Sequence, residues 1–179
     1  VLAEVDGEIL EIGFGTGINL SFYPEHVRRI TIVESNIGMN SKANKRIKSS
    51  PIEVDIHTLS ADSLPFADGT FESVVSTYTL CSITNIDKVL SEIKRVLRPD
   101  GRFFFLEHGL SPDPNVQKWQ NRFNSVNKAL ADGCNLNRNI KELIEYHNLQ
   151  ISKLENFYLE KTPRIGGYTY KGIALKNRG

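Results

Sequence analysis

The sequence predicts an α/β fold in which helices cover both faces of a parallel sheet, and three observations lead to this prediction. Short runs rich in β-branched or aromatic residues alternate with longer segments of helical period. The first run ends in a glycine-rich loop, as strands do before a helix in open α/β sheets. The run at residues 102–107 is almost continuously apolar, which predicts a strand buried on both faces. The chain of 179 residues suits one core, so we predict a single domain over residues 1–179.

The predicted elements follow one another without an internal repeat or linker. Strands are expected at residues 8–12, 29–33, 54–59, 72–79, 102–107, 149–158 and 168–175. Helices are expected at residues 17–22, 36–48, about 86–97, 112–130 and 139–147. The third of these helices shows the clearest apolar face, formed by Ile86, Val89, Leu90, Ile93, Val96 and Leu97. Pro99, Asp100 and Gly101 then predict a turn before the fifth strand.

Composition bounds the partners and the compartment. A net charge of +1 supplies no general attraction to nucleic acid, so no nucleic-acid partner is predicted. The two cysteines, Cys81 and Cys134, are too few for a disulfide scaffold and predict a reducing, cytoplasmic location. The sequence begins at Val1 without an initiator methionine, so we expect a segment to precede it. Because such a segment can carry an anchor, membrane association of the full-length form is left open.

The loop after the first strand predicts a cofactor site. Glycines let the backbone pass close to a ligand, and the helix start beyond them presents free amides. The fingerprint of dinucleotide-binding loops has a third glycine at its sixth position, where this chain has Ile18. Glu11 places an acid beside the loop, which disfavours a pyrophosphate and favours the ammonium group of a methionine moiety. These features favour S-adenosylmethionine over NAD.

Two further acids stand where such a cofactor needs them. Glu34 ends the second strand, and its carboxylate can accept hydrogen bonds from both ribose hydroxyls, a feature that NAD sites share. Asp62 follows the third strand between Ala61 and Leu64, where it can accept a hydrogen bond from an adenine amine. Either acid alone could be a solvated loop residue, but together with Glu11 and the glycines they predict an adenosyl site.

These motifs make the chain resemble the class I S-adenosylmethionine-dependent methyltransferases over nearly its whole length. The glycine run from Glu11 to Gly17 is similar to the first motif of that family, and residues 61–66 resemble its adenine loop. Residues 96–101 resemble the segment before its fifth strand, with Asp100 in place of a more usual glycine. The resemblance implies a Rossmann-like three-layer α-β-α sandwich with a seven-stranded, mostly parallel sheet whose last strand is antiparallel. The residues expected to bind the cofactor are Glu11, Gly13, Phe14, Gly15, Thr16, Gly17, Glu34, Ser35, Ala61, Asp62, Ser63 and Thr79.

The acceptor is expected to be a small molecule. No Asn-Pro-Pro-aromatic run follows the fourth strand, and residues 77–82 stand there instead. Residues 79–83, residues 107–108 and above all residues 132–136 followed by Arg138 are similar to the thiol S-methyltransferase group. Ubiquinone/menaquinone C-methyltransferases share the motifs up to the fifth strand. A thiol is therefore the first candidate acceptor, followed by a quinone or phenol, and a cofactor-binding module without turnover is the alternative of another class.

Few residues suggest themselves for the acceptor side. His108 ends the fifth strand, where it could act as a base or be a hydrogen-bonded structural histidine. Asp132 could orient or deprotonate an acceptor, although Asp-Gly is also an ordinary turn. The aromatic side chains Tyr78, Trp119 and Phe123 could line an apolar pocket or belong to the core. The four histidines show no ligand spacing, so no metal is predicted.

Overall fold

One sheet organises the chain in the computed structural model, which describes residues 1–35, 41–131 and 133–176. Within these ranges seven strands pair in the order β3-β2-β1-β4-β5-β7-β6. The strands are β1 Ile9–Ile12, β2 Arg29–Val33, β3 Glu53–His57, β4 Phe71–Thr77, β5 Leu97–His108, β6 Leu149–Tyr158 and β7 Tyr168–Lys176. Strand β7 runs antiparallel to both β5 and β6, while β1 to β5 pair in parallel. The predicted mostly parallel, seven-stranded sheet is confirmed.

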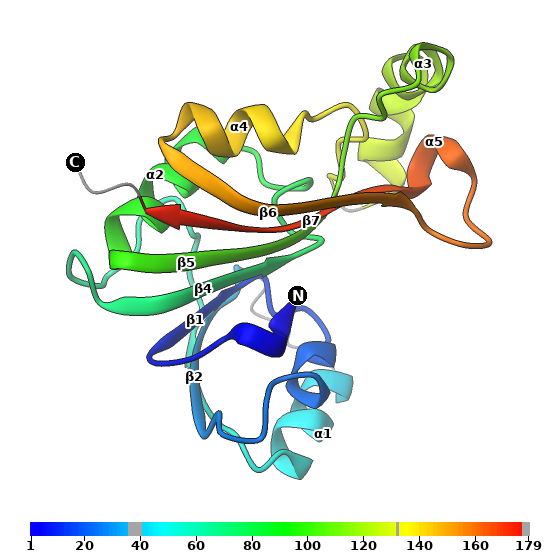
Figure 1. Cartoon of the computed structure of the whole chain (residues 1–179). Helices are drawn as coiled ribbons and strands as arrows, with labels where there is room; N and C mark the ends of the chain where they lie inside the picture. Colours follow the sequence, from blue (N-terminus) through cyan, green and yellow to red (C-terminus); the bar gives the residue numbers. More distant parts are fainter. Residues whose placement is uncertain (36–40, 132, 177–179) are drawn as a thin grey trace.

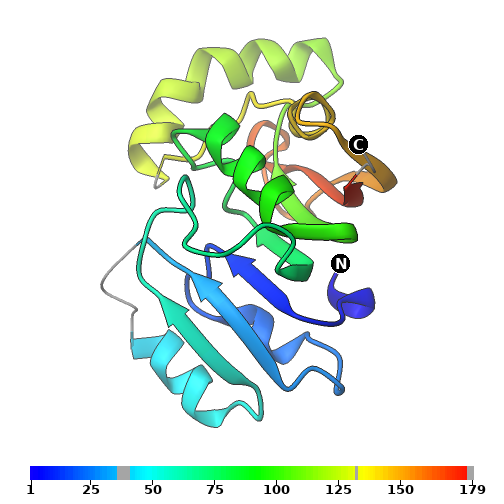
Figure 2. The same cartoon turned by 90° about the vertical axis from the view of Figure 1, so that its left-hand side faces the viewer.

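Helical segments cover both faces of the sheet. The helices are α1 Ser41–Ser49, α2 Ile86–Val96, α3 Pro114–Leu130, α4 Ile140–Tyr146 and α5 Arg164–Gly167, with 3-10 turns η1 Leu2–Glu4 and η2 Ile18–Ser21. Figure 1 shows α4 above the sheet and α1 below it. Figure 2 shows α3 crossing the top of the molecule, far from α1 at the bottom. The chain is therefore a three-layer α-β-α sandwich.

Strand β5 separates two apolar cores. Successive side chains of a strand point to opposite faces, so a continuously apolar strand feeds both layers. Phe103 and Phe105 pack in one core with the buried face of α2 and with α4. Phe104 packs in the other core with the N-terminal segment and Ala43 of α1. All three phenylalanines are fully buried, as the sequence predicted for the centre of the sheet.

Helix α2 shows why these residues form a helix at this place. Its five buried side chains, Ile86, Val89, Leu90, Ile93 and Val96, recur at spacings of three and four. Lys94 and Arg95 lie in its last turn, where cations favour the negative end of the helix dipole. The helix ends at Val96, and the next residue, Leu97, is extended and begins β5. The predicted helix is confirmed to within one residue at its C-terminal end.

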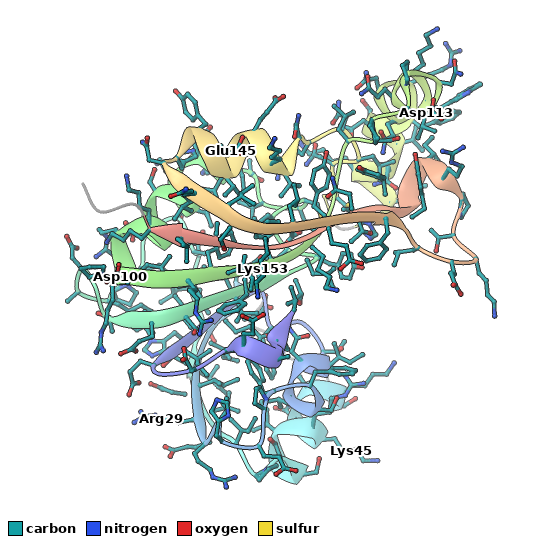
Figure 3. All side chains as sticks on the ribbon, viewed as in Figure 1. Arg29, Lys45, Asp100, Asp113, Glu145 and Lys153 are labelled. Atoms are coloured by element: carbon teal, nitrogen blue, oxygen red, sulfur yellow. The ribbon has the colours of Figure 1, made fainter. Side chains whose placement is uncertain are left out.

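Several elements differ from the predictions in their bounds or in kind, and one predicted helix lies partly outside the described residues. Strand β5 begins at Leu97 rather than residue 102, because the predicted turn is an irregularity within the paired strand. Asp100 takes a positive φ of 67° there and lies at the opposite end of the sheet from α3 (Figure 3). Residues 17–22 form the short 3-10 turn η2 instead of an α-helix. The first five residues of the helix predicted at 36–48 lie outside the described residues.

Helix α3 is held to the body by a polar side chain. Its buried residue is Gln120, which accepts a hydrogen bond from the Ser111 amide and donates to the carbonyls of Gly109 and Ile165. Asp113, labelled beside α3 in Figure 3, caps its first turn through the Asn115 amide.

Among the described residues no helix is both long and apolar enough to cross a bilayer.

Candidate active site

A cavity of about 710 Å³ opens at the carboxyl ends of β1, β2 and β4, where open α/β sheets bind their ligands. Each strand contributes its last residue and the loop that follows, and the start of α2 closes one side. The lining residues are Ile12, Gly13, Phe14, Gly15, Thr16, Ile18, Asn19, Val33, Glu34, Ser35, Leu59, Ser60, Ala61, Asp62, Thr77, Tyr78, Thr79, Ser82, Ile83, Thr84, Asn85 and Val89.

The loop after β1 forms the floor of this cavity, and its glycines are required by space and by backbone conformation. Gly13 has a φ of +76°, and a Cβ there would lie 2.0 Å from Thr79 Oγ1. Gly17 has a φ of +70°, and a Cβ there would lie 2.6 Å from the ring of Phe14. Residues with a side chain rarely adopt this left-handed backbone conformation, so glycine is the residue that fits both positions. The loop therefore offers its bare backbone to a ligand.

Glu34 joins the end of β2 to the glycine loop. Its Oε2 accepts a hydrogen bond of 2.9 Å from the Gly15 amide. The side chain is partly exposed and lines the cavity. A carboxylate in this position can accept hydrogen bonds from the hydroxyl groups of a ribose.

Asp62 lies across the cavity, on the loop after β3. Its Oδ2 accepts a hydrogen bond of 3.3 Å from Asn85 Nδ2 at the N-cap of α2. Hydrogen bonds from Ser60 and Asn85 lower the pKa of Asp62, so its carboxylate stays ionised. Buried Ala61 beside it supplies apolar surface, so an aromatic base with an exocyclic amine would fit here.

Glu11 lies behind the cavity instead of lining it. The carboxylate is 1% exposed and accepts hydrogen bonds of 2.8 Å from both Asn19 Nδ2 and Tyr23 Oη. Burial raises the pKa of Glu11 to about 7, although these two hydrogen bonds oppose the rise. Asn19 itself lines the cavity, so it stands between Glu11 and any ligand.

His108 is separated from the cavity by Tyr78. The two rings lie 4.4 Å apart between centroids, and Tyr78 lines the cavity whereas His108 does not. The Nδ1 atom of His108 is buried without a hydrogen-bond partner among the described residues. Burial lowers the pKa of His108, which keeps the imidazole neutral at pH 7. Tyr78 holds a positive φ of 50°, which is rare for a residue with a side chain.

The structure brings together nine of the twelve residues predicted to hold the cofactor. Glu11, Gly17 and Ser63 do not line the cavity. Among the candidates for the acceptor side, Tyr78 lines it, while Trp119 and Phe123 stack on each other, largely exposed, on α3. Asp132 lies outside the described residues. Cofactor binding by these residues stays a prediction.

Several lining residues were missed from the sequence. Asn19 carries no motif of its own, and its role follows from its hydrogen bonds to Glu11 and to Thr77 Oγ1. Ser82, Ile83 and Asn85 come from the loop after β4, and such loops at the carboxyl end of a strand are a general signal. Within residues 1–35, 41–131 and 133–176, no group of three or more potential ligands could hold a metal ion.

Comparison with known proteins agrees with this geometry and defines the class of protein. The chain belongs to the methyltransferase domain family, whose model matches residues 10–105. It is an S-adenosylmethionine-dependent methyltransferase.

The relatives lie in the groups that the motifs indicated. Human thiol S-methyltransferase TMT1A is 32% identical over 172 residues, which cover 91% of this chain and 70% of that protein. Human thiol S-methyltransferase TMT1B is 35% identical, over 87% of this chain and 63% of its own length. The ubiquinone/menaquinone biosynthesis C-methyltransferase UbiE of Desulfotalea psychrophila is 30% identical over 56% of this chain and 41% of its own. The resemblance to both groups is confirmed.

The solved structures show the same fold. The YcgJ protein of Bacillus subtilis matches with a TM-score of 0.77 at 19% identity, over 99% of this chain and 95% of its own. A geranyl diphosphate methyltransferase in complex with S-adenosylmethionine matches with a TM-score of 0.71 at 15% identity, over 98% of this chain and 81% of its own. At these identities the likeness supports the architecture alone.

Proposed function

We propose that the chain transfers the methyl group of S-adenosylmethionine to a small-molecule thiol bound in the cavity. The thiol S-methyltransferases among its relatives support this acceptor class, although the chain spans only 70% and 63% of the two human proteins. The cofactor supplies an electrophilic methyl group on its sulfonium. The chain must then hold the cofactor, place the acceptor sulfur in line behind that methyl group and exclude water.

The residues that line the cavity fit this cofactor. The bare backbone of Gly13 and Gly15 allows close approach of the methionine moiety. Asn19, which donates a hydrogen bond to buried Glu11, lies between that carboxyl group and the ammonium group of the cofactor. Glu34 accepts from the ribose hydroxyls, and Asp62 accepts from the adenine amine. These assignments use two carboxylates and one loop, each at the end of a different strand.

One observation favours a thiol as the acceptor: the described lining offers no general base. Its ionisable side chains are Glu34, Asp62 and Tyr78. The first two are assigned to the cofactor, and burial raises the pKa of Tyr78, which keeps that phenol protonated. A thiol with a pKa of about 8.5 is already partly ionised at neutral pH and needs no base.

A quinone or phenol acceptor is the second candidate, and His108 is the observation that favours it. A carbon or phenolic oxygen nucleophile needs its proton removed. Neutral His108, whose Nδ1 has no hydrogen-bond partner in the described part of the chain, is able to accept that proton. Its ring lies behind Tyr78, so Tyr78 must turn aside before His108 can meet an acceptor. A module that binds the cofactor without turnover is the third candidate.

The test is a screen of acceptors with a methyl-labelled donor. Thiols, quinones, phenols and amines are incubated with the protein and labelled S-adenosylmethionine, and methylated products are counted. We expect products from thiols first. Products from phenols or quinones alone would contradict the thiol assignment, and cofactor binding without any product would favour the module.

Replacing His108 separates the two catalytic alternatives. In H108A, thiol methylation is expected to keep a rate that rises with pH toward the pKa of the thiol itself, since no base is needed. Phenol methylation that depends on His108 would instead fall by about a hundredfold, a typical contribution of a general base. A large loss with thiols would contradict the proposed role of the acceptor's own ionisation.

A cytoplasmic location is part of the proposal. Cys81 and Cys134 are both buried and free, which suits a reducing compartment. Fractionation of cells that express the full-length protein tests this location directly.

A further inference from the structure

Residues 79–83, which follow β4, form one wall of the cavity, and side chains from outside the cavity, buried or half-buried, bind their backbone. Glu107, next to the end of β5, is 0% exposed. Its Oε1 accepts hydrogen bonds from the Thr79 amide at 3.1 Å and from Ser76 Oγ at 2.8 Å, and its Oε2 accepts from the Cys81 amide at 3.2 Å. One carboxylate thus binds two amides of the same loop.

The carbonyl groups of that loop are bound from the other side. The guanidinium group of Arg138 donates to the carbonyls of Leu80 and Ile83. Asn135 donates to the Cys81 carbonyl twice, from its backbone amide at 2.8 Å and from Nδ2 at 3.0 Å. Arg138 and Asn135 belong to the region after α3, which is similar to the thiol S-methyltransferases. The residues assigned to the cofactor do not explain that similarity.

A buried acid and a guanidinium group therefore bind opposite sides of one loop. Burial lowers the pKa of Arg138, and attraction to Glu107 is among the interactions that oppose this change. A buried charge is tolerated when its hydrogen bonds are satisfied. Here the partners are backbone amides and carbonyls of residues 79–83. The same bonds help to hold Tyr78 at its positive φ, since strained conformations persist where the surroundings over-determine them.

The neighbouring loop is held by the same kind of pair. Glu92 accepts from the Leu64 amide at 2.7 Å, and Arg95 donates to the carbonyls of Leu64 at 2.9 Å and Phe66 at 2.7 Å. This loop continues from Asp62. In both loops, therefore, a glutamate accepts hydrogen bonds from backbone amides and an arginine donates to backbone carbonyls.

Taking the cavity as the cofactor site of the proposed function, we infer that Glu107, Asn135 and Arg138 are positioning residues for methyl transfer. They bind the backbone of residues 79–83 and thereby place Thr79, Ser82 and Ile83 against the cofactor. Thr79 also donates from Oγ1 to the Gly13 carbonyl at 3.4 Å, so a hydrogen bond links this loop to the glycine loop. None of the three positioning residues lines the cavity.

The test compares paired variants of the whole chain by calorimetry with S-adenosylhomocysteine, the demethylated product. R138K keeps the charge but lacks the fork that reaches two carbonyls, and E107Q replaces one acceptor oxygen with a donor. Each is expected to weaken binding about tenfold, with faster hydrogen exchange of the amides at residues 79 and 81. The exposed controls R122K and E160Q are expected to bind as the wild type does.

The double variant distinguishes positioning from simple support of the fold. If both residues hold one loop, E107Q and R138K together weaken binding by much less than the product of their separate effects. Lower thermal stability with affinity within twofold of wild type in both single variants would overturn the inference. If R138K does not fold, N135A serves the same comparison, because it removes the Nδ2 bond to the Cys81 carbonyl, together with the side-chain bonds to Asn124 and to the Gly133 carbonyl.

Failure of the proposed function gives a different result. A wild-type protein that does not bind S-adenosylhomocysteine would overturn the assignment of the cavity and the positioning role with it. Wild-type binding with normal affinity in E107Q, R138K and N135A would overturn the positioning role alone.

Discussion

At the scale of single residues, Gly13 is the position where the glycine loop tolerates least change. An added Cβ would lie 2.0 Å from Thr79 Oγ1 and 2.4 Å from Thr79 Cγ2, and the φ of +76° is itself strained for alanine. We expect G13A to lose S-adenosylhomocysteine binding by at least a hundredfold, because the loop or Thr79 must move into the cavity. Calorimetry measures this loss.

Gly166 supplies the matched control for that substitution. It lies in α5, and a Cβ there meets nothing within 4 Å. G166A is expected to bind as the wild type does. If G13A also kept its affinity, the loop would not be the part of the cavity that contacts the cofactor.

Glu11 makes the stability of the fold depend on pH. Its pKa is about 7 in the folded chain against an ordinary value of 4.5 for an exposed glutamate, so between these values the folded state holds a proton that the unfolded state releases. The free energy of unfolding therefore falls as pH rises through this window, by up to ~1.4 kcal/mol per pH unit. Below the window both states are protonated, and above it both are ionised.

The expected result is a difference between wild type and E11Q. Chemical unfolding at a series of pH values should show the wild type losing roughly 3 kcal/mol relative to E11Q between pH 4.5 and 7. Outside the window the difference should stay constant. Parallel curves throughout would show that the Glu11 carboxyl group ionises alike in the folded and unfolded states.

At the scale of elements, α2 joins the core to the active site. Its N-cap residue Asn85 binds Asp62, and its C-terminal part carries Arg95, which holds the neighbouring loop. Its buried face anchors both ends, and Ile93 in the middle of that face is 0% exposed. We expect I93A to cost about 2–5 kcal/mol of stability through lost burial and a cavity. Urea unfolding measures this cost.

The exposed face of the same helix provides the comparison. K88A changes an exposed side chain on α2 and is expected to stay within about 0.5 kcal/mol of the wild type. Equal losses in K88A and I93A would mean that helix propensity, and not the buried face, determines the stability of α2.

Elements also show where prediction from sequence succeeds. The strands and α2 were predictable because their apolar periods are local properties of the chain, as in residues 103–105 or in the buried positions of α2. Strand β5 began earlier than predicted, since pairing with β4 carries it through a turn that local propensity marks as a stop. The large exposed aromatic side chains of α3 were also unpredictable, because whether a helix buries its apolar or its polar face depends on what packs against it.

The candidate site divides in the same way. The place of Gly13, Glu34 and Asp62 in the cavity could be predicted, because Gly13 and Glu34 directly follow strands and Asp62 lies in the loop after β3. Asn19, and the loop-holding pair of Glu107 and Arg138, could not. Glu107 and Arg138 bind residues that are 26 to 58 positions away in the sequence, and Asn19 acts through its hydrogen bond to buried Glu11. No local sequence pattern encodes such contacts.

At the scale of the whole molecule, the cofactor assignment predicts a change in the stability of the entire fold. A ligand that binds only the folded state adds RT ln(1 + [L]/Kd), which is about 2.7 kcal/mol at a concentration of 100 Kd. For a domain of 150–250 residues, each kcal/mol raises the melting temperature by about 2–4 °C. S-adenosylhomocysteine at that concentration should therefore raise the melting temperature by roughly 5–10 °C.

NAD is the informative comparison ligand in the same experiment. It shares the adenosine that Glu34 and Asp62 are assigned to bind, but its pyrophosphate would approach the loop beside Glu11. Ionisation of Glu11 above pH 7 increases that repulsion, so at pH 8 NAD is expected to leave the melting temperature unchanged while S-adenosylhomocysteine raises it. G13A should respond to neither ligand. Equal stabilisation by NAD and S-adenosylhomocysteine would show that the cavity reads adenosine alone and that Glu11 does not select the sulfonium cofactor.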